Sequence, residues 1–239
     1  MRGTRMIRMI LLTGIAGMLF GTDARAQNPA HDSDSPAATV VTPLPKDVDP
    51  DSRYRLPLPK RDDMDDYGRK VFDELTDSEH SEHTGLRTPA GIRLYSPKLA
   101  KPMSDAFRYL RTETGLGDRL TEIAILVTAR EMDNQYEWAS HERAGLKAGV
   151  EPSVIDIIKY NKPAVGLGKK EAVIIAFGRE LFAQKKVSSA TFAEALRLFG
   201  PRGTVDLASL MGQYAATSAL VNAFDMQLPE GRKPLLPAR

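Results

Sequence analysis

Apolar residues recur at the spacing of a helical face along most of the chain. The clearest example is formed by Leu120, Ile123, Ala124 and Val127, because residues three and four apart lie on one side of a helix. The same spacing predicts further helices over residues 62–75, 97–113, 152–158, 169–184, 188–199 and 204–224. No segment has the alternation of a strand, and the aperiodic residues 76–97 are predicted to form a long loop. The pattern therefore predicts an all-α helical bundle.

A central helical hairpin is predicted over residues 120–150, with its turn at Asp133 and Asn134. Asn134 is a suitable N-cap for the second helix. Glu137 and His141 then lie one turn apart on the same side of that helix, close enough to share a proton or a ligand. Glu122 lies near the edge of the apolar face of the first helix, so we expect its carboxylate to be half-buried at most. Most of the candidate catalytic residues of the chain therefore lie in this hairpin.

The N-terminus has the pattern of a signal peptide. Several arginines precede an apolar run over residues 9–20, and Ala24-Arg25-Ala26 has the small-x-small pattern of signal peptidase cleavage. We expect residues 1–26 to be removed, so that the mature chain begins near Gln27. The apolar run is too short for an ordinary membrane span and no later segment has one, so a soluble periplasmic or secreted product without membrane contact is expected.

The next segment, residues 27–59, is rich in proline, aspartate, serine and alanine and has little periodicity. Such a composition buries too little apolar surface to become ordered by itself. The sequence therefore predicts a disordered linker here, followed by a folded domain over residues 60–234.

Composition and charge narrow the possible functions. The 239 residues are 42% hydrophobic and 27% charged, which is an ordinary globular balance. The net charge of +2 becomes about −1 when the leader is excluded, and no basic stripe interleaved with aromatic residues follows, so nucleic acid is not expected as a partner. The chain contains no cysteine, which excludes disulfides and thiol chemistry. The helix over 204–224 is rich in small residues, which favours close packing between helices or subunits.

The hairpin carries a longer pattern: Glu122, then NQYEWASH over residues 134–141, then GLKAG over residues 145–149. Outside it stand GLR at 85–87, LYSPKLA at 94–100, LVNAFD at 220–225 and LPEG at 228–231. These runs resemble the carboxymuconolactone decarboxylase-like members of the alkylhydroperoxidase D superfamily over roughly residues 53–234. The resemblance implies the helical bundle of that family and, with the small-residue helix, a homo-oligomer. It says little about the substrate, because one fold supports several chemistries.

The chain departs from the peroxidase members of this superfamily. Those members place a CxxC pair before the histidine, whereas Asn134 and Glu137 occupy the two positions here. Without a thiolate there is no nucleophile for a peroxide, so peroxiredoxin activity is not expected. A glutamate four residues before the histidine resembles the decarboxylase branch, where acid–base residues move protons on a lactone or an enol.

His141, Glu137 and Glu122 are therefore the candidate catalytic residues. An imidazole with its ordinary pKa of about 6.5 can act as acid or base near neutral pH, and Glu137 or Glu122 would orient the ring. The candidate substrate-binding residues include Arg87 or Arg93, whose guanidinium would bind an anion through paired N–H groups. The others are Tyr95, Tyr136 and Trp138. The expected reaction is a decarboxylation, isomerisation or lactone opening of a small carboxylate or lactone, without a cofactor.

Structural roles compete with these assignments. Glu137 could close a capping box with Asn134, and Glu122 could form an ion pair with Arg130 or Arg143. Tyr136 and Trp138 could be core residues. His80 and His83 could bind a metal with His31 or a carboxylate, but two histidines in a loop are weak evidence and no metal is predicted. The alternative function is that of a non-catalytic exported protein that binds a small ligand.

Overall fold

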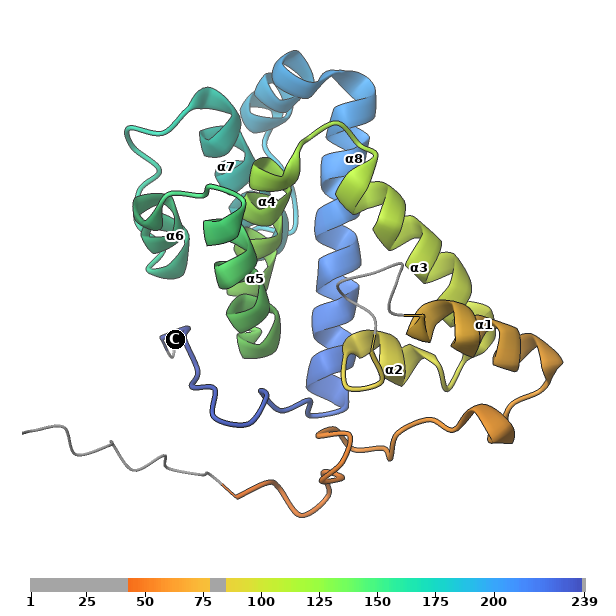
Figure 1. The fold of residues 1–239 in the computed structure, drawn as a ribbon. Coiled ribbons are helices and arrows are strands. Elements are labelled where there is room, and N and C mark those ends of the chain that lie inside the picture. Colours follow the sequence, from red (N-terminus) through yellow and green to blue (C-terminus); the bar gives the residue numbers. More distant parts are fainter. Residues whose placement is uncertain (1–42, 78–84, 238–239) are drawn as a thin grey trace, which may run out of the picture. The chain divides into compact units, whose positions relative to one another are not determined.

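The computed structural model describes residues 43–77 and 85–237, all of which belong to the unit formed by residues 39–239. Helices are the only regular elements of these residues, which confirms the all-α prediction (Figure 1). They are a short 3-10 helix η1 (Arg61–Asp63) and the α-helices α1 (Asp66–Thr76), α2 (Pro89–Arg93), α3 (Pro97–Thr112), α4 (Asp118–Glu131), α5 (Gln135–Lys147), α6 (Pro152–Lys159), α7 (Lys169–Ala183) and α8 (Ser189–Ala223). No helix of the described residues combines the length and hydropathy needed to cross a membrane.

Helix α4 forms the centre of the fold. Every residue from Thr121 to Arg130 is buried, and the helix packs against α5, α6, α7 and α8 (Figure 1). A helix that is covered on all sides has no face exposed to solvent. Glu122 is accordingly only 4% exposed, so the expectation of a half-buried carboxylate is wrong. The hairpin prediction itself is confirmed, since α4 and α5 pack together and their turn lies at Met132–Asn134.

Helix α8 combines the two helices predicted over residues 188–199 and 204–224. It bends at Gly200, whose φ of 69° lies outside the helical range, and Pro201 follows directly. Glycine tolerates this left-handed backbone, and proline at the start of a helical turn needs no hydrogen-bond donor. The predicted break is therefore present as a kink within one long element.

Part of the predicted linker packs against the helices of the domain. In residues 43–59, Val48, Ser52 and Tyr54 are buried, and Tyr54 packs in one cluster with Ile92 and Val221. This segment contacts apolar side chains of other elements, which its own composition could not reveal. Residues 27–42, like the predicted signal peptide, lie outside the described residues.

The residues after the predicted C-terminal limit at residue 234 also contact the domain. Leu236 is buried, and the Gln135 side chain binds the backbone of the tail through hydrogen bonds to Leu235 and Leu236. The tail therefore packs on the N-terminal turn of α5.

The predicted loop over residues 76–97 contains helix α2, which the sequence pattern missed. Thr88 caps this helix through its hydroxyl, and Pro89 occupies its first turn. A Cβ at Gly91 would lie 2.0 Å from the carbonyl oxygen of Leu86, so the close approach requires glycine. Five residues are too short to produce a recognisable period, which explains the error.

Candidate active site

Helices α4 and α5 bring two predicted catalytic residues into direct contact. His141 Nδ1 lies 2.7 Å from Glu122 Oε2, and both side chains are almost fully buried. A carboxylate can only accept, so Nδ1 carries the proton and donates it to Glu122. This arrangement leaves Nε2 as the ring nitrogen that can accept or deliver a proton.

Arg111 and Tyr214 hold the opposite side of Glu122. The Arg111 guanidinium donates to Glu122 Oε1 at 3.0 Å and to the Tyr214 hydroxyl at 2.6 Å. Burial alone would lower the pKa of Arg111, but the nearby Tyr214 and Glu122 raise it above its ordinary value. The Tyr214 ring in turn meets the His141 ring edge to face at 5.1 Å. The imidazole is thus held by a carboxylate, and that carboxylate by a permanent cation.

Glu137 lies next to the other nitrogen of the ring. Its Oε2 atom is 3.6 Å from His141 Nε2, an ion-pair distance that is too long for a direct hydrogen bond. Burial raises the pKa of the Glu137 carboxyl, although His141, Arg93 and Arg111 partly oppose the effect. A protonated Glu137 would be an acid beside the imidazole.

Helix capping does not account for the Glu137 side chain. Asn134 caps α5 by accepting from the backbone N–H of Glu137 at 2.9 Å. The reciprocal bond of a capping box would need the backbone N–H of Asn134, which donates to Ala129 instead. The capping-box reading of Glu137 is therefore wrong.

Arg93 is the second buried guanidinium near the site. It donates to Thr217 Oγ1 at 2.6 Å and lies over the Phe107 ring at 5.0 Å from its centroid. Burial lowers its pKa, while the charge of Glu137 acts in the opposite direction. One turn before Thr217, the Gln213 Nε2 atom is buried and has no hydrogen-bond partner among the described residues. An unsatisfied buried donor is costly, so the Gln213 side chain suits an acceptor such as a carboxylate oxygen.

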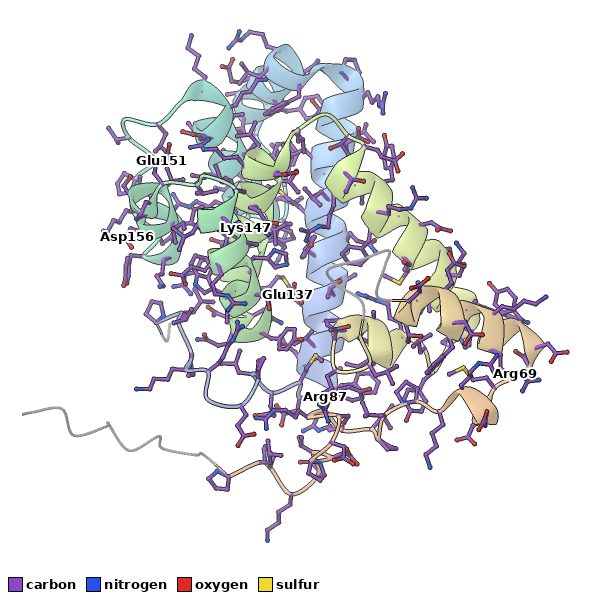
Figure 2. All side chains as sticks on the ribbon, viewed as in Figure 1. Arg69, Arg87, Glu137, Lys147, Glu151 and Asp156 are labelled. Atoms are coloured by element: carbon purple, nitrogen blue, oxygen red, sulfur yellow. The ribbon has the colours of Figure 1, made fainter. Side chains whose placement is uncertain are left out.

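Two predicted substrate-binding residues lie elsewhere. Arg87 is exposed and donates to the Asp51 carbonyl, and Figure 2 shows it well apart from Glu137. Tyr95 is 46% exposed and donates its hydroxyl proton to the Pro57 carbonyl. Their loop contains α2, which directs Arg93 inward and leaves these two side chains outside.

The two aromatic residues of the predicted set belong to packed clusters. Trp138 is fully buried in the main core, and its Nε1–H donates to Glu142. Tyr136 packs beside Tyr54 and donates to the Arg87 carbonyl, and burial raises its pKa to about 12. Trp138 is therefore a core residue, and Tyr136 packs against the cluster that contains Tyr54.

The sequence reasoning missed Arg111, Tyr214, Thr217 and Gln213. One signal was present: Arg111 follows Phe107 by one turn, which puts a charge on the predicted buried stripe of α3. The predicted partner Arg130 instead pairs with Asp133, at 2.7 Å. The histidines of the weak metal hypothesis, His31, His80 and His83, lie outside the described residues.

Comparison with solved structures identifies similar helical arrangements. One is a protein of unknown function from Agrobacterium tumefaciens, described as a putative antioxidant defence protein AhpD, with a TM-score of 0.53 and 14% identity over 58% of this chain and 95% of that chain. Another is a variant of the debrominase Bmp8 in complex with 2,3,4-tribromopyrrole, with a TM-score of 0.57 and 12% identity over 73% of this chain and 91% of that chain. A third is the AhpD core of an uncharacterized peroxidase-related protein from Ralstonia eutropha, with a TM-score of 0.57 and 18% identity over 77% of this chain and 98% of that chain. No family model and no curated protein sequence matches the chain.

Proposed function

We propose that this chain, which has the alkylhydroperoxidase D-like fold, is a carboxymuconolactone decarboxylase-like enzyme that transfers protons without a cofactor. Its substrate class is a small carboxylate or lactone, and its reaction a decarboxylation, isomerisation or lactone opening. The observation that carries the proposal is the buried His141, held at Nδ1 by Glu122 and flanked at Nε2 by Glu137.

The proton chemistry follows from the two different sides of the imidazole. Because Nδ1 is bound to Glu122, His141 exchanges its proton with substrate through Nε2. Glu122 stabilises the imidazolium when Nε2 is protonated, and Arg111 holds Glu122 in position through their ion pair. Glu137, with its raised pKa, serves as the proton reservoir for Nε2.

Arg93 is the anchor for a substrate carboxylate, in place of the predicted alternative Arg87. Its planar guanidinium is buried over the Phe107 ring and donates to Thr217 Oγ1. In a decarboxylation, the C–C bond to the leaving CO₂ breaks and its electron pair moves into a conjugated carbonyl. The protonated His141 then delivers its proton from Nε2 to the resulting enolate carbon, and Glu137 reprotonates the ring.

Thiol-dependent reduction of peroxides is not part of the proposal. The sequence contains no cysteine, so the chain has neither a nucleophilic thiolate nor a resolving thiol. Family likeness to peroxidase-related proteins therefore concerns the fold and not that reaction.

A binding function without turnover is the second candidate. Its support is that His141, Glu137 and Glu122 are at most 5% exposed, as in a packed structural cluster. The similar structure of Bmp8 was obtained with a small ring compound, 2,3,4-tribromopyrrole. This chain would then hold a small ligand beside His141 without changing it.

The test compares His141→Gln with wild type, with carboxymuconolactone as the first probe and then a panel of small lactones and β-keto acids. Loss of a general acid or base costs about 10²-fold or more in turnover, so we expect that loss with little change in melting temperature. Glu142→Gln is the matched control, because Glu142 is the next residue of α5 but bonds to Trp138 and Lys159. Undiminished turnover in His141→Gln would contradict the proposed role of His141 in catalysis. Equal ligand binding by wild type and His141→Gln, with no turnover of any probe by wild type, would favour the second candidate.

A further inference from the structure

A shallow depression of about 200 Å³ lies where the C-terminal tail crosses α5. Its lining consists of Ala139 and Arg143 from α5, and Arg232, Lys233 and Leu235 from the tail. Ala139 and Arg143 are two residues beyond Glu137 and His141, which corresponds to roughly 200° around a helix. The depression is therefore on the face of α5 that points away from the candidate active site.

Three of the five lining residues are cationic. Arg143 and Lys233 are exposed and Arg232 is partly exposed. Among the described residues, no carboxylate forms an ion pair with any of these three side chains. Elsewhere on the surface, by contrast, arginines such as Arg55, Arg61 and Arg197 each meet an aspartate or glutamate. Like charges that face one depression without a counterion repel each other.

The tail is held in this position by specific bonds. Gln135 Oε1 accepts from the backbone N–H groups of Leu235 and Leu236, both at 3.0 Å, and its Nε2 donates to the Leu236 carbonyl at 2.7 Å. The buried Leu236 side chain adds an apolar anchor in the main core. These contacts keep Arg232 and Lys233 opposite Arg143 despite their mutual repulsion.

We propose that this depression, the tail–α5 site, binds a small polyanion with phosphate or carboxylate oxygens. Arginine side chains from two segments can donate paired N–H groups to such oxygens, and Lys233 adds a third charge. Ala139 and Leu235 form an apolar floor under a ligand backbone. Binding here bridges α5 and the tail, so the ligand stabilises the folded chain.

The test measures binding of pyrophosphate and of citrate by calorimetry at matched ionic strength, together with the melting temperature. We expect saturable binding of at least one probe and a rise in melting temperature with its concentration. The two arms distinguish a phosphate from a carboxylate ligand. If neither probe binds saturably to the full chain, the proposal is wrong.

Variants separate a built site from general attraction of anions. The triple variant Arg143→Gln, Arg232→Gln, Lys233→Gln should bind the probe at least about tenfold more weakly, a loss of about 1.4 kcal/mol. Its melting temperature without probe should not fall, because the repulsion is removed; a fall would indicate that these side chains support the fold instead. Lys98→Gln, at an exposed position on α3, removes one charge elsewhere and should leave binding unchanged.

A last variant tests the role of the tail contacts. Gln135→Ala retains all three cations but removes the hydrogen bonds that hold the tail. It should weaken probe binding severalfold. Equal binding by Gln135→Ala, or an equal loss in Lys98→Gln, would overturn the tail–α5 site.

Discussion

The two ring nitrogens of His141 have different environments. Nδ1 faces the ionised pair of Glu122 and Arg111, whereas Nε2 faces a carboxyl that burial keeps in its protonated form to higher pH. Two carboxylates in one cluster thereby have different roles, because one has a cation directly bound and the other does not.

This difference predicts a pH effect on stability at Glu137. Burial raises the pKa of Glu137 above its ordinary value of 4.5, so the folded chain keeps a proton that the unfolded chain has lost. The stability from this group is complete below pH 4.5 and is lost as the pH rises through the folded pKa. Glu137→Gln cannot titrate, so its melting temperature relative to wild type should increase from pH 4 towards pH 8 in thermal scans.

Glu151→Gln is the matched control with the opposite sign. Glu151 is exposed, and its hydrogen bond from Arg119 lowers its pKa. Stability from Glu151 is therefore present at neutral pH and is lost as the pH falls through the lowered pKa. Relative to wild type, Glu151→Gln should become less stable as the pH rises. Parallel pH curves for the two variants would contradict the assigned burial of Glu137.

At the scale of elements, the site depends on the close contact of α4 with α7 and α8. Gly178 of α7 makes this approach possible, because a Cβ there would lie 2.5 Å from Val127 Cγ1 and 3.1 Å from Met211 Cε. A dense core cannot absorb such an overlap without shifting its helices. The position of α4, and with it that of Glu122, is thus set from the side opposite the site.

Gly178→Ala should therefore destabilise the fold by roughly 1–3 kcal/mol through overpacking. Urea unfolding of Gly178→Ala and of wild type measures the change. The prediction fails if Gly178→Ala is as stable as wild type.

At the scale of the whole molecule, α8 has a second face that this chain leaves exposed. Its outer side carries Val205, Ser209, Gly212, Ala216 and Ala219. Small side chains on one face allow the backbone of another helix to approach closely. We propose that copies of the chain associate through this face into a homo-oligomer.

Ala216→Glu should convert that oligomer into a monomer, because it places like charges opposite each other at the contact. The monomer itself should fold normally, since Ala216 is exposed. Val165→Glu adds the same charge at a residue that is 78% exposed and should leave the assembly intact. Light scattering coupled to size-exclusion chromatography measures the mass. A monomeric wild type at micromolar concentration would rule out the assembly.

Export is the second proposal at this scale. The apolar run and Ala24-Arg25-Ala26 favour removal of residues 1–26, so intact mass spectrometry of the exported protein should find a start at Gln27 or within a few residues of it. Ala26→Asp, which replaces the small residue at the cleavage site, should block processing. An exported wild-type chain that keeps Met1 would disprove this proposal.

The sequence by itself determined the local features of the protein. Helix periods, caps and the Gly200-Pro201 break act within a few residues, so they could be recognised along the chain and agree with α3 to α8. The pairing of Glu137 with His141 is likewise a one-turn relation. Helix α2 was not predicted because its five residues contain no recognisable period. The packing of residues 43–59 was not predicted because the core partners of this segment lie far along the chain.

Only the tertiary structure decided which side chains complete the site. Arg111 and Tyr214 are separated by 103 residues, and Arg93 and Thr217 by 124, so their contacts depend on how α2 and α3 pack against α8. The raised pKa of Glu137 also arises from burial, which no local pattern contains. Arg87 and Arg93 look alike in sequence, but the orientation of α2 leaves one in solvent and buries the other beside Glu137. Packing direction and exclusion of water are properties of the assembled helices, and they selected the residues of the candidate site.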